Sequence, residues 1–190
     1  MNMKNNLNTG LVLILAMTTV AFTTISEKRV KLEDSKVTWK GYKVTGEHEG
    51  TINLKDGKLM FEDNKLVGGN FVIDMTSISN QDLSGEWKEK LEGHLKSDDF
   101  FGVEKHPTAS LVITNVKGSG KNYSVTGDLT IKNITNSITF DMTVEENSAM
   151  AALKIDRSKF DVRYGSPSFF NDLQDKAIYD EFDINVNLSF

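Results

Sequence analysis

The feature that most constrains this chain is the alternation of apolar and polar residues, which recurs through most of the sequence after Lys36. In residues 138–144, Ile138, Phe140 and Met142 interleave with polar residues, and residues 183–189 repeat the pattern. Successive side chains of a β-strand point to opposite faces, so this period predicts strands with one face in a core and the other in water. Strands of this kind are typical of antiparallel sheets.

The same period recurs often enough to predict about eight strands in one meander. Further alternating stretches lie at residues 37–39, 48–54, 71–75, 111–113, 123–131 and 151–155. Clusters of turn-forming residues separate them at residues 55–58, 62–65, 118–122 and 133–136. The first cluster contains Asp56-Gly57, a dipeptide that favours a tight hairpin turn.

An antiparallel sheet of this size predicts a barrel. An open sheet has two unpaired edges and an apolar face to cover, and closure into a barrel removes both problems. A barrel of ~8 strands is either filled by its own side chains or wide enough for one small ligand. The inward positions are apolar and nearly free of charge, so any ligand must be apolar. Alternation alone leaves a filled core and a cavity as open alternatives.

One segment has a helical period instead. In Gly85 to Lys96, Trp87, Leu91 and Leu95 recur every four residues, and charged side chains occupy most of the other positions. This spacing predicts a short amphipathic helix inserted into the all-β fold.

A second short helix is predicted near the C-terminus. Ser166-Pro167 is typical of an N-cap followed by proline in the first helical turn, and Phe169, Phe170 and Leu173 follow at helical spacing.

The N-terminal segment predicts export. Residues 1–26 contain one charged side chain, Lys4, then the apolar run 11–17, then small residues. This order is that of a secretory signal peptide, and the run 11–22 is shorter than the ~20 residues of a membrane span. We expect cleavage between Ala21 and Ser26, which leaves residues 27–190 as one periplasmic or secreted domain; an uncleaved membrane anchor is the alternative.

Charge and cysteine content argue against several classes of protein. The chain has 22 Lys and Arg against 27 Asp and Glu, a formal net charge of -5, and no cysteine. A net negative chain is a poor ligand for nucleic acid or for an anionic membrane surface. We therefore expect no nucleic-acid partner and no stable membrane insertion after signal cleavage. The absence of cysteine excludes disulfides, thiolate metal sites and a cysteine nucleophile.

The histidines give little support for catalysis. His48 lies between Glu47 and Glu49, and a strand would place the imidazole and the two carboxylates on opposite faces, so no local metal triad forms. The sequence has no glycine-rich phosphate loop, no G-x-S-x-G and no H-E-x-x-H motif. We predict a protein that is not an enzyme and has no cofactor and no metal. A hydrolytic function would depend on His48, His94 and His106 alone.

Two polar residues are candidates for contact with a ligand head group. Arg157 follows Asp156, which favours an ion pair at the surface or at a barrel end; binding of an anionic head group is the alternative. His94 on the predicted helix is expected to be a hydrogen-bonded structural residue, with donation to a head group as its alternative.

The string HLKSDDFF at residues 94–101, followed by VEKHPTA at 103–109, resembles the YceI-like family of exported, lipocalin-like lipid-binding proteins. Further matches are NFVIDM at 70–75, GDLTI at 127–131 and DRSKF at 156–160, and together the resemblance covers residues 37–188. It implies an eight-stranded antiparallel lipocalin-like barrel with a helical insertion. It also implies an apolar tunnel for a polyisoprenoid or similar long-chain amphiphile, whose burial contributes ~0.8 kcal/mol per CH2 group.

The resemblance and the strand parity together imply a set of ligand contacts inside the barrel. The tunnel-lining candidates are Trp39, Phe71, Ile73, Leu111, Ile113, Leu129, Ile131, Phe140 and Met142. The helix and the pair Phe100-Phe101 are expected to close one end, with Leu91 and Leu95 facing inward. The segment from Ser166 to Asp180 either caps the other mouth or packs elsewhere through its Phe pair.

The predicted function is that of an exported binding protein that sequesters or carries a long-chain apolar ligand. Lysines and acidic residues mix in residues 86–106 and form no basic mouth. A neutral or singly charged head group is therefore an alternative to the pyrophosphate that family members can carry. The alternative function is a structural or stress-response barrel that binds no ligand and acts through protein contacts, including a homodimer.

Overall fold

The structure, a computed structural model, describes residues 24–190 of the chain. The alternating stretches form strands, and their bounds are β1 (Ile25–Arg29), β2 (Lys36–Lys43), β3 (Gly46–Glu62), β4 (Lys65–Asn80), β5 (Thr108–Ser119), β6 (Asn122–Ile131), β7 (Ile134–Val144), β8 (Ser148–Asp156) and β9 (Ile178–Ser189). One α-helix, α1 (Gly85–Lys96), and the short 3-10 helices η1 (Leu32–Asp34), η2 (Arg157–Phe160) and η3 (Gln174–Lys176) complete the described elements.

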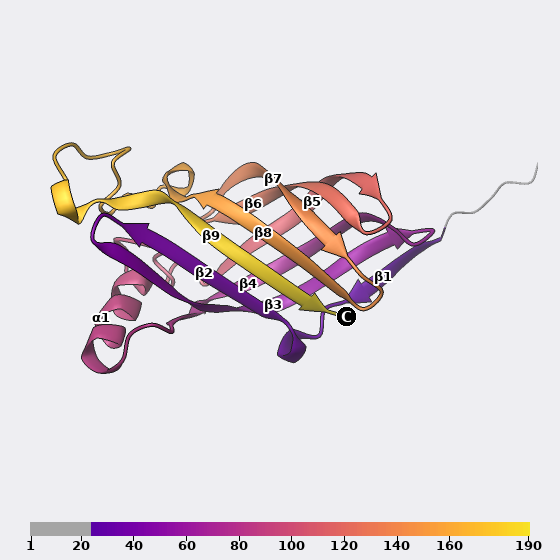
Figure 1. Cartoon of the computed structure of the whole chain (residues 1–190), viewed down its shortest axis with the longest axis horizontal. Coiled ribbons are helices and arrows are strands. Elements are labelled where there is room, and N and C mark those ends of the chain that lie inside the picture. Colours follow the sequence, from indigo (N-terminus) through magenta and orange to yellow (C-terminus); the bar gives the residue numbers. More distant parts are fainter. Residues whose placement is uncertain (1–23) are drawn as a thin grey trace, which may run out of the picture.

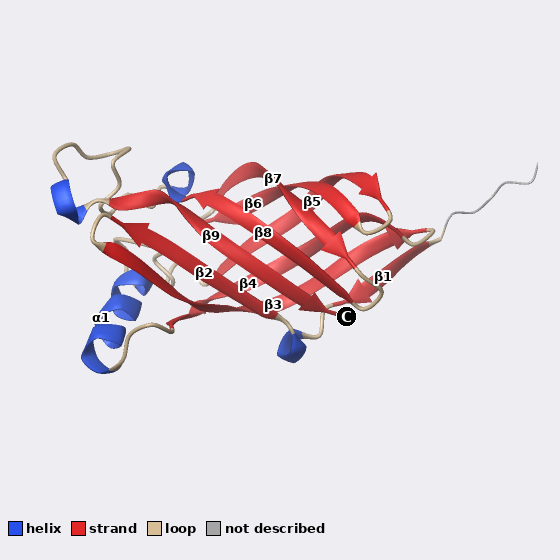
Figure 2. Cartoon of the chain, viewed as in Figure 1, coloured by secondary structure: helices blue, strands red, loops and turns tan. Residues whose placement is uncertain are grey.

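Strands β2 to β9 form a closed antiparallel barrel (Figure 1). Neighbouring strands follow the order β3-β2-β9-β8-β7-β6-β5-β4, and the pairing of β3 with β4 closes the ring. Coloured by secondary structure, the strands make up nearly the whole body and α1 lies against one end (Figure 2). The predicted eight-stranded barrel with one helical insertion is confirmed.

A ninth strand, β1, is not part of the closed circuit of strand pairings. Strand β3 has 17 residues and β2 only 8, so β2 pairs with the first half of β3 and β1 pairs with the second half. Residues 1–23 of the predicted leader lie outside the described residues. The strand β1 begins at Ile25, within the predicted leader, and was not expected from the sequence.

The register keeps one set of side chains inside the barrel. Along β6, buried positions alternate with half-buried ones, and Leu129 pairs with Leu111 of β5. Directly opposed residues of an antiparallel pair share a face, so the apolar sets of neighbouring strands converge on the same interior.

The prediction of a hairpin turn at Asp56-Gly57 is wrong, because both residues lie inside β3. The register shifts between Leu54 and Asp56, which marks a bulge in the strand. A Cβ atom at Gly57 would lie 2.8 Å from the ring of Phe71. The glycine therefore permits close packing across the strand pair instead of a turn.

The helix α1 has the predicted bounds, but its apolar stripe is only partly buried. Leu95 is buried and Leu91 is half-buried, whereas Trp87 is 71% exposed. The first three residues of α1, Gly85 to Trp87, are all exposed, so the helix packs on the barrel through its later turns and Trp87 does not reach the core.

The second helix predicted from Ser166-Pro167 is not present. The amides of Phe169 and Phe170 both donate to the carbonyl of Ser166, which makes a single turn. Asp172 and Gln174 then adopt positive φ angles, a conformation that a right-handed helix cannot continue through. Phe169 and Phe170 are both exposed, so the pair does not enter the core.

A buried polar network attaches α1 to the barrel. The side chain of Glu92 accepts hydrogen bonds from the amide of Asn80 and the hydroxyl of Ser79, both at 2.8 Å. The fully buried side chain of Asn80 donates to the carbonyl of Glu49 at 3.0 Å and accepts from the amide of Leu83 at 2.8 Å. These bonds fix the exit of β4 and the path of the chain into α1.

None of the helices within residues 24–190 combines the length and the apolar character needed to cross a membrane.

The network predicts the effect of truncating Asn80. Asn80→Ala removes the hydrogen-bond partner of the Leu83 amide and one of the two donors to the Glu49 carbonyl, and we expect a loss of about 2 kcal/mol in the free energy of unfolding. The control Asn187→Ala removes an exposed amide and should change stability by no more than ~0.5 kcal/mol. Urea denaturation of both variants measures the difference, and equal stabilities would show that the network does not hold this corner.

Candidate functional site

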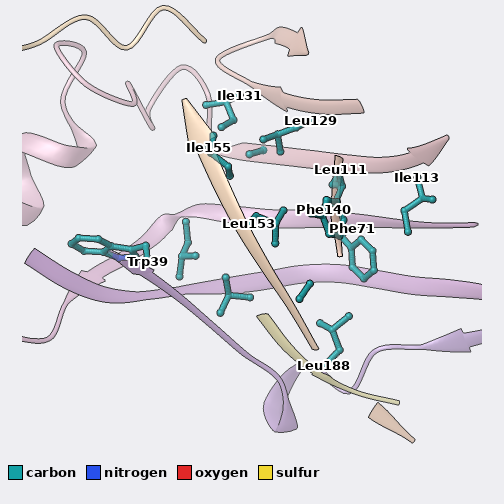
Figure 3. Close-up of a cluster of buried hydrophobic side chains, with 14 of the residues drawn as sticks. Trp39, Phe71, Leu111, Ile113, Leu129, Ile131, Phe140, Leu153, Ile155 and Leu188 are labelled. Carbon is teal, nitrogen blue, oxygen red and sulfur yellow. The ribbon is translucent and has the colours of Figure 1, made fainter. Parts of the chain in front are cut away.

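The inward faces of the barrel do not meet everywhere, and a cavity of about 180 Å³ remains between them. A space of this size accommodates on the order of a dozen water-sized groups. Its wall comes from all eight barrel strands and from residues 95–101. Figure 3 shows side chains of several strands, among them Leu129, Phe140 and Leu153, directed into the barrel interior.

Most of the residues selected from the sequence lie at the wall of this cavity. They are Trp39, Phe71, Ile73, Leu95, Phe100, Phe101, Leu111, Leu129, Ile131, Phe140, Met142 and Arg157. Their contact with a ligand stays a prediction, because the position of a side chain at a wall does not show what it binds.

Three selected residues lie elsewhere. Ile113 is buried on β5 but is absent from the cavity wall. Leu91 is half-buried and packs against the core from α1. His94 is absent from the wall and contacts the ring of the wall residue Phe100 and that of Tyr164.

The wall also contains residues that the sequence analysis did not select. These are chiefly inward residues of β3, β8 and β9, namely Ile52, Leu54, Leu153, Ile155, Phe182, Ile184, Val186 and Leu188. Their period-two pattern was visible in the sequence. The sequence does not show how far along each strand the cavity extends.

The two ends of the barrel interior differ. At one end Leu59 and Val125 are fully buried, and neither borders the cavity, so side chains fill this region. At the end where β2 finishes and β9 begins, the cavity wall includes Gly41, Ile178 and Tyr179, and Tyr179 is exposed. The cavity is therefore blocked by packed side chains at one end and approaches the surface at the other.

Trp39 forms the wall beside the open end, and its orientation is set by its neighbours on β3. The indole Nε1 donates to the carbonyl of Thr51 at 3.2 Å. A Cβ at Gly50 would lie 2.7 Å from the indole ring, so the ring lies over the space that a side chain there would need. The glycine lets the indole lie flat along the β2–β3 pair.

Arg157 is the one ionisable wall residue besides Tyr179 among residues 24–190, and its donors already have partners. Its guanidinium is only 2% exposed and donates to the carbonyls of Val162 at 2.8 Å, Ile178 at 2.9 Å and Tyr179 at 3.2 Å. The carboxylate of Asp180 lies 3.6 Å away. Burial lowers the pKa of Arg157, and Asp180 opposes that shift.

Of the two expected places for an ion pair of Arg157, the surface or a barrel end, the structure has the barrel end, but the pair is buried and its partner is Asp180 and not the adjacent Asp156. Asp156 instead accepts hydrogen bonds from the amide and the hydroxyl of Ser158 and caps η2. The arginine joins the end of β8 to the start of β9, and Phe100 stacks on it with its ring centroid 5.3 Å from the guanidinium carbon.

His94 does not make the hydrogen bond expected of it. Its ring packs edge-on against Tyr164 and Phe100, at centroid distances of 4.3 and 5.6 Å. Within the described part of the chain its Nε2 is buried without a hydrogen-bond partner. Burial lowers the pKa of His94, and the charge of Asp99 opposes that shift.

The contact of His94 with Tyr164 also decides between the two alternatives for the C-terminal segment. The segment was expected either to cap the mouth opposite α1 or to pack elsewhere. Residues 163–180 lie at the same end of the barrel as α1 (Figure 1), and the amide of Ile178 donates to the carbonyl of Gly165 at 2.8 Å. The segment thus borders the open end of the cavity, and the opposite end is closed by core packing.

His48 lies outside the cavity wall. Its Nδ1 lies 2.8 Å from the carboxylate of Asp82. Burial by itself raises the pKa of Asp82. Hydrogen bonds from the Glu49 amide, His48 and Asn80 together lower that pKa by more, so the net shift is downward. Within residues 24–190, no three His, Asp or Glu side chains come together in a group that could hold a metal ion.

Comparison with known proteins places this geometry among relatives. The family model for the YceI-like domain matches residues 28–190. A UPF0312 protein of Photorhabdus laumondii is 36% identical over 89 residues, which cover 47% of this chain and 44% of that protein. The chain spans about half the length of the curated relatives it matches.

Solved structures share the barrel. The crystal structure of BcnA from Burkholderia cenocepacia superposes with a TM-score of 0.68 at 26% identity, covering 84% of this chain and 98% of that one. A polyisoprenoid-binding domain from Saccharophagus degradans superposes with a TM-score of 0.58, covering 87% and 97% of the two chains. Its identity is 13%, so this second likeness shows the fold alone.

The difference between the packed and the hollow regions predicts unequal costs for the same truncation. Leu59→Ala removes a side chain surrounded on every side and should cost about 4 kcal/mol of unfolding free energy. Leu153→Ala at the cavity wall removes atoms with neighbours on one side only and should cost about 2 kcal/mol. Chemical denaturation compares the two, and equal costs would indicate that the space beside Leu153 is filled.

The buried imidazole predicts acid sensitivity. Because the pKa of His94 is lower in the folded chain than its ordinary 6.5, the unfolded chain binds the proton first as the pH falls. Stability should therefore decrease as the pH falls through about 6.5, and His94→Phe should flatten this slope. The control Tyr164→Phe keeps the ring contact and should retain the slope. Identical slopes in all three proteins, measured by urea titration, would contradict this account.

Proposed function

Because this chain belongs to the YceI-like family, we propose that it binds one long apolar lipid, a polyisoprenoid or a similar chain, inside its barrel. The observation that supports this most directly is the cavity, whose wall is almost entirely hydrocarbon. A protein interior normally packs to the density of an organic crystal, so a retained apolar space of this size calls for an explanation. A ligand that completes the packing supplies one.

The energetics favour a long chain over a short one. Burial of about ten CH2-sized groups contributes ~8 kcal/mol before the costs of association. Those costs are at least ~4 kcal/mol, so a fragment of a few carbons binds weakly and a chain that fills the cavity binds usefully. The proposed ligand is therefore one whose apolar part occupies most of the wall.

The wall supports carriage of a lipid and offers little for chemistry. Among its residues in the described chain there is no Ser, Thr, His, Lys, Asp or Glu side chain that could act as nucleophile or base. We propose a carrier or scavenger function on this basis. The polyisoprenoid-binding domain of Saccharophagus degradans, which has the same fold, supports the class of ligand.

The site of action that fits this function is outside the cytoplasm. The signal-peptide pattern of residues 1–26 supports export, and a lipid that leaves a membrane needs a dry apolar container in an aqueous compartment. We propose that the mature barrel provides that container in the periplasm or in the secreted state.

A plugging substitution tests the proposed function. Ile131 borders the cavity, and Ile131→Trp should fill part of it and lower lipid affinity roughly tenfold or more. The probe is a long-chain polyprenol offered to protein purified without detergent, and native mass spectrometry measures both the co-purified and the newly bound lipid.

The matched control lies on the outer face of the same strand. Ser124 faces away from the interior on β6, so Ser124→Trp adds the same ring without changing the cavity, and uptake should stay at the parental level. Recovery of bare parent protein that takes up no polyprenol and no fatty acid would overturn the proposal.

A further inference from the structure

Among the cavity-wall residues that the structure describes, only Gly41 has no side chain. On β2 the residues Val37, Trp39 and Gly41 share the inward face, and all three border the cavity. Val37 pairs with Val186 of β9, and Gly41 pairs with Phe182 of β9. The apolar stripe of β2 therefore ends in a gap at the open end of the barrel.

The backbone does not require glycine at this position. Gly41 is not among the glycines with a positive φ angle, so a residue with a side chain can adopt its conformation. A Cβ atom built on it has no atom within 4 Å, whereas a Cβ on Gly50 would collide with Trp39 and with the backbone of Ser79. Gly41 thus serves neither a turn nor a close approach of chains.

Glycine in a strand interior is costly, because it loses more conformational freedom on folding than other residues and packs against nothing. Its presence here is explained by the space it leaves. The indole of Trp39 is turned toward Gly50 and donates to the Thr51 carbonyl. The space at Gly41 therefore continues the cavity between Trp39 and Phe182, which lies on the neighbouring strand β9.

The packed end of the barrel determines which ligands reach the space at Gly41. Leu59 and Val125 block the interior at the far end, so a bound chain that lies along the cavity ends there. The chain can extend only toward Gly41, Ile178 and Tyr179. The space at Gly41 is then the part of the cavity that only a long ligand reaches.

We propose that Gly41 is a specificity-determining residue that lets the barrel accept long apolar chains. A side chain at this position shortens the usable cavity without disturbing its deep part. This inference rests on the proposed lipid-binding function and names the position that selects among lipids by length.

The test compares chain lengths in the full-length protein. Gly41→Leu is offered geraniol, farnesol and a long-chain polyprenol, and dissociation constants are measured by titration calorimetry. We expect affinity for the long polyprenol to fall about tenfold or more while affinity for geraniol stays within about threefold. The thermal midpoint of Gly41→Leu should equal or exceed that of the parent, because the substitution relieves the entropic cost of glycine.

Two further variants make the result specific. Thr38→Leu adds the same side chain to the outward face of β2, and it should leave both affinities at parental values. Gly41→Ala adds a single methyl group and should give a smaller loss for the long polyprenol; it also serves if Gly41→Leu fails to fold.

The outcomes separate this inference from the proposed function. If the parent binds prenols and Gly41→Leu retains the parental preference for length, the inference is wrong and the proposed function stands. If both Gly41 variants lose thermal stability and weaken all ligands equally, the glycine is structural and the inference is also wrong. If the parent binds no member of the series, the proposed function fails first.

Discussion

The pairing of β3 with β4 is the constraint on which the rest of the structure depends, because it closes the sheet into a ring. Once the ring is closed, one face of every strand must point into the barrel, whether or not the side chains on that face fill the interior. The circumference is set by eight strands and their stagger, so the interior volume is fixed by the backbone and not by the side chains available to fill it. Leu59 and Val125 fill one end, and the middle and the other end stay hollow.

Arg157, the buried ionisable residue of the cavity wall, lies at the hollow end, and its hydrogen bonds leave little for a ligand. Arg157 donates hydrogen bonds to three carbonyls and lies near the carboxylate of Asp180, so its charge is balanced inside the protein. A doubly charged phosphate beside it would bring uncompensated charge into an apolar wall, which is unfavourable. His94 adds a neutral, aromatic contact to the segment at residues 163–180. The chemistry of this end favours ligands whose buried part is uncharged.

Stability and the proposed binding function depend on different residues of the same barrel. The packed end and the Asn80 network provide closely fitted contacts, whereas the cavity wall forgoes contacts that a filled core would have. Gly41 illustrates the same division at one residue, since a side chain there would favour the strand and reduce the space. Such a division is common where a protein must keep a binding site open at some expense of stability.

From the sequence by itself one could determine most strands of the barrel, the barrel class, the bounds of α1 and the inward parity of residues such as Phe71, Leu111 and Phe140, because the period of two is a local property. The string at residues 94–101 also indicated the family. Only the tertiary structure decided that Asp56-Gly57 lies inside a strand, that Arg157 is buried against Asp180, and that Ile131 borders a cavity while Ile113 does not. The physical reason is that parity states which way a side chain points, whereas its neighbours across the barrel depend on closure, stagger and packing between residues far apart in the chain.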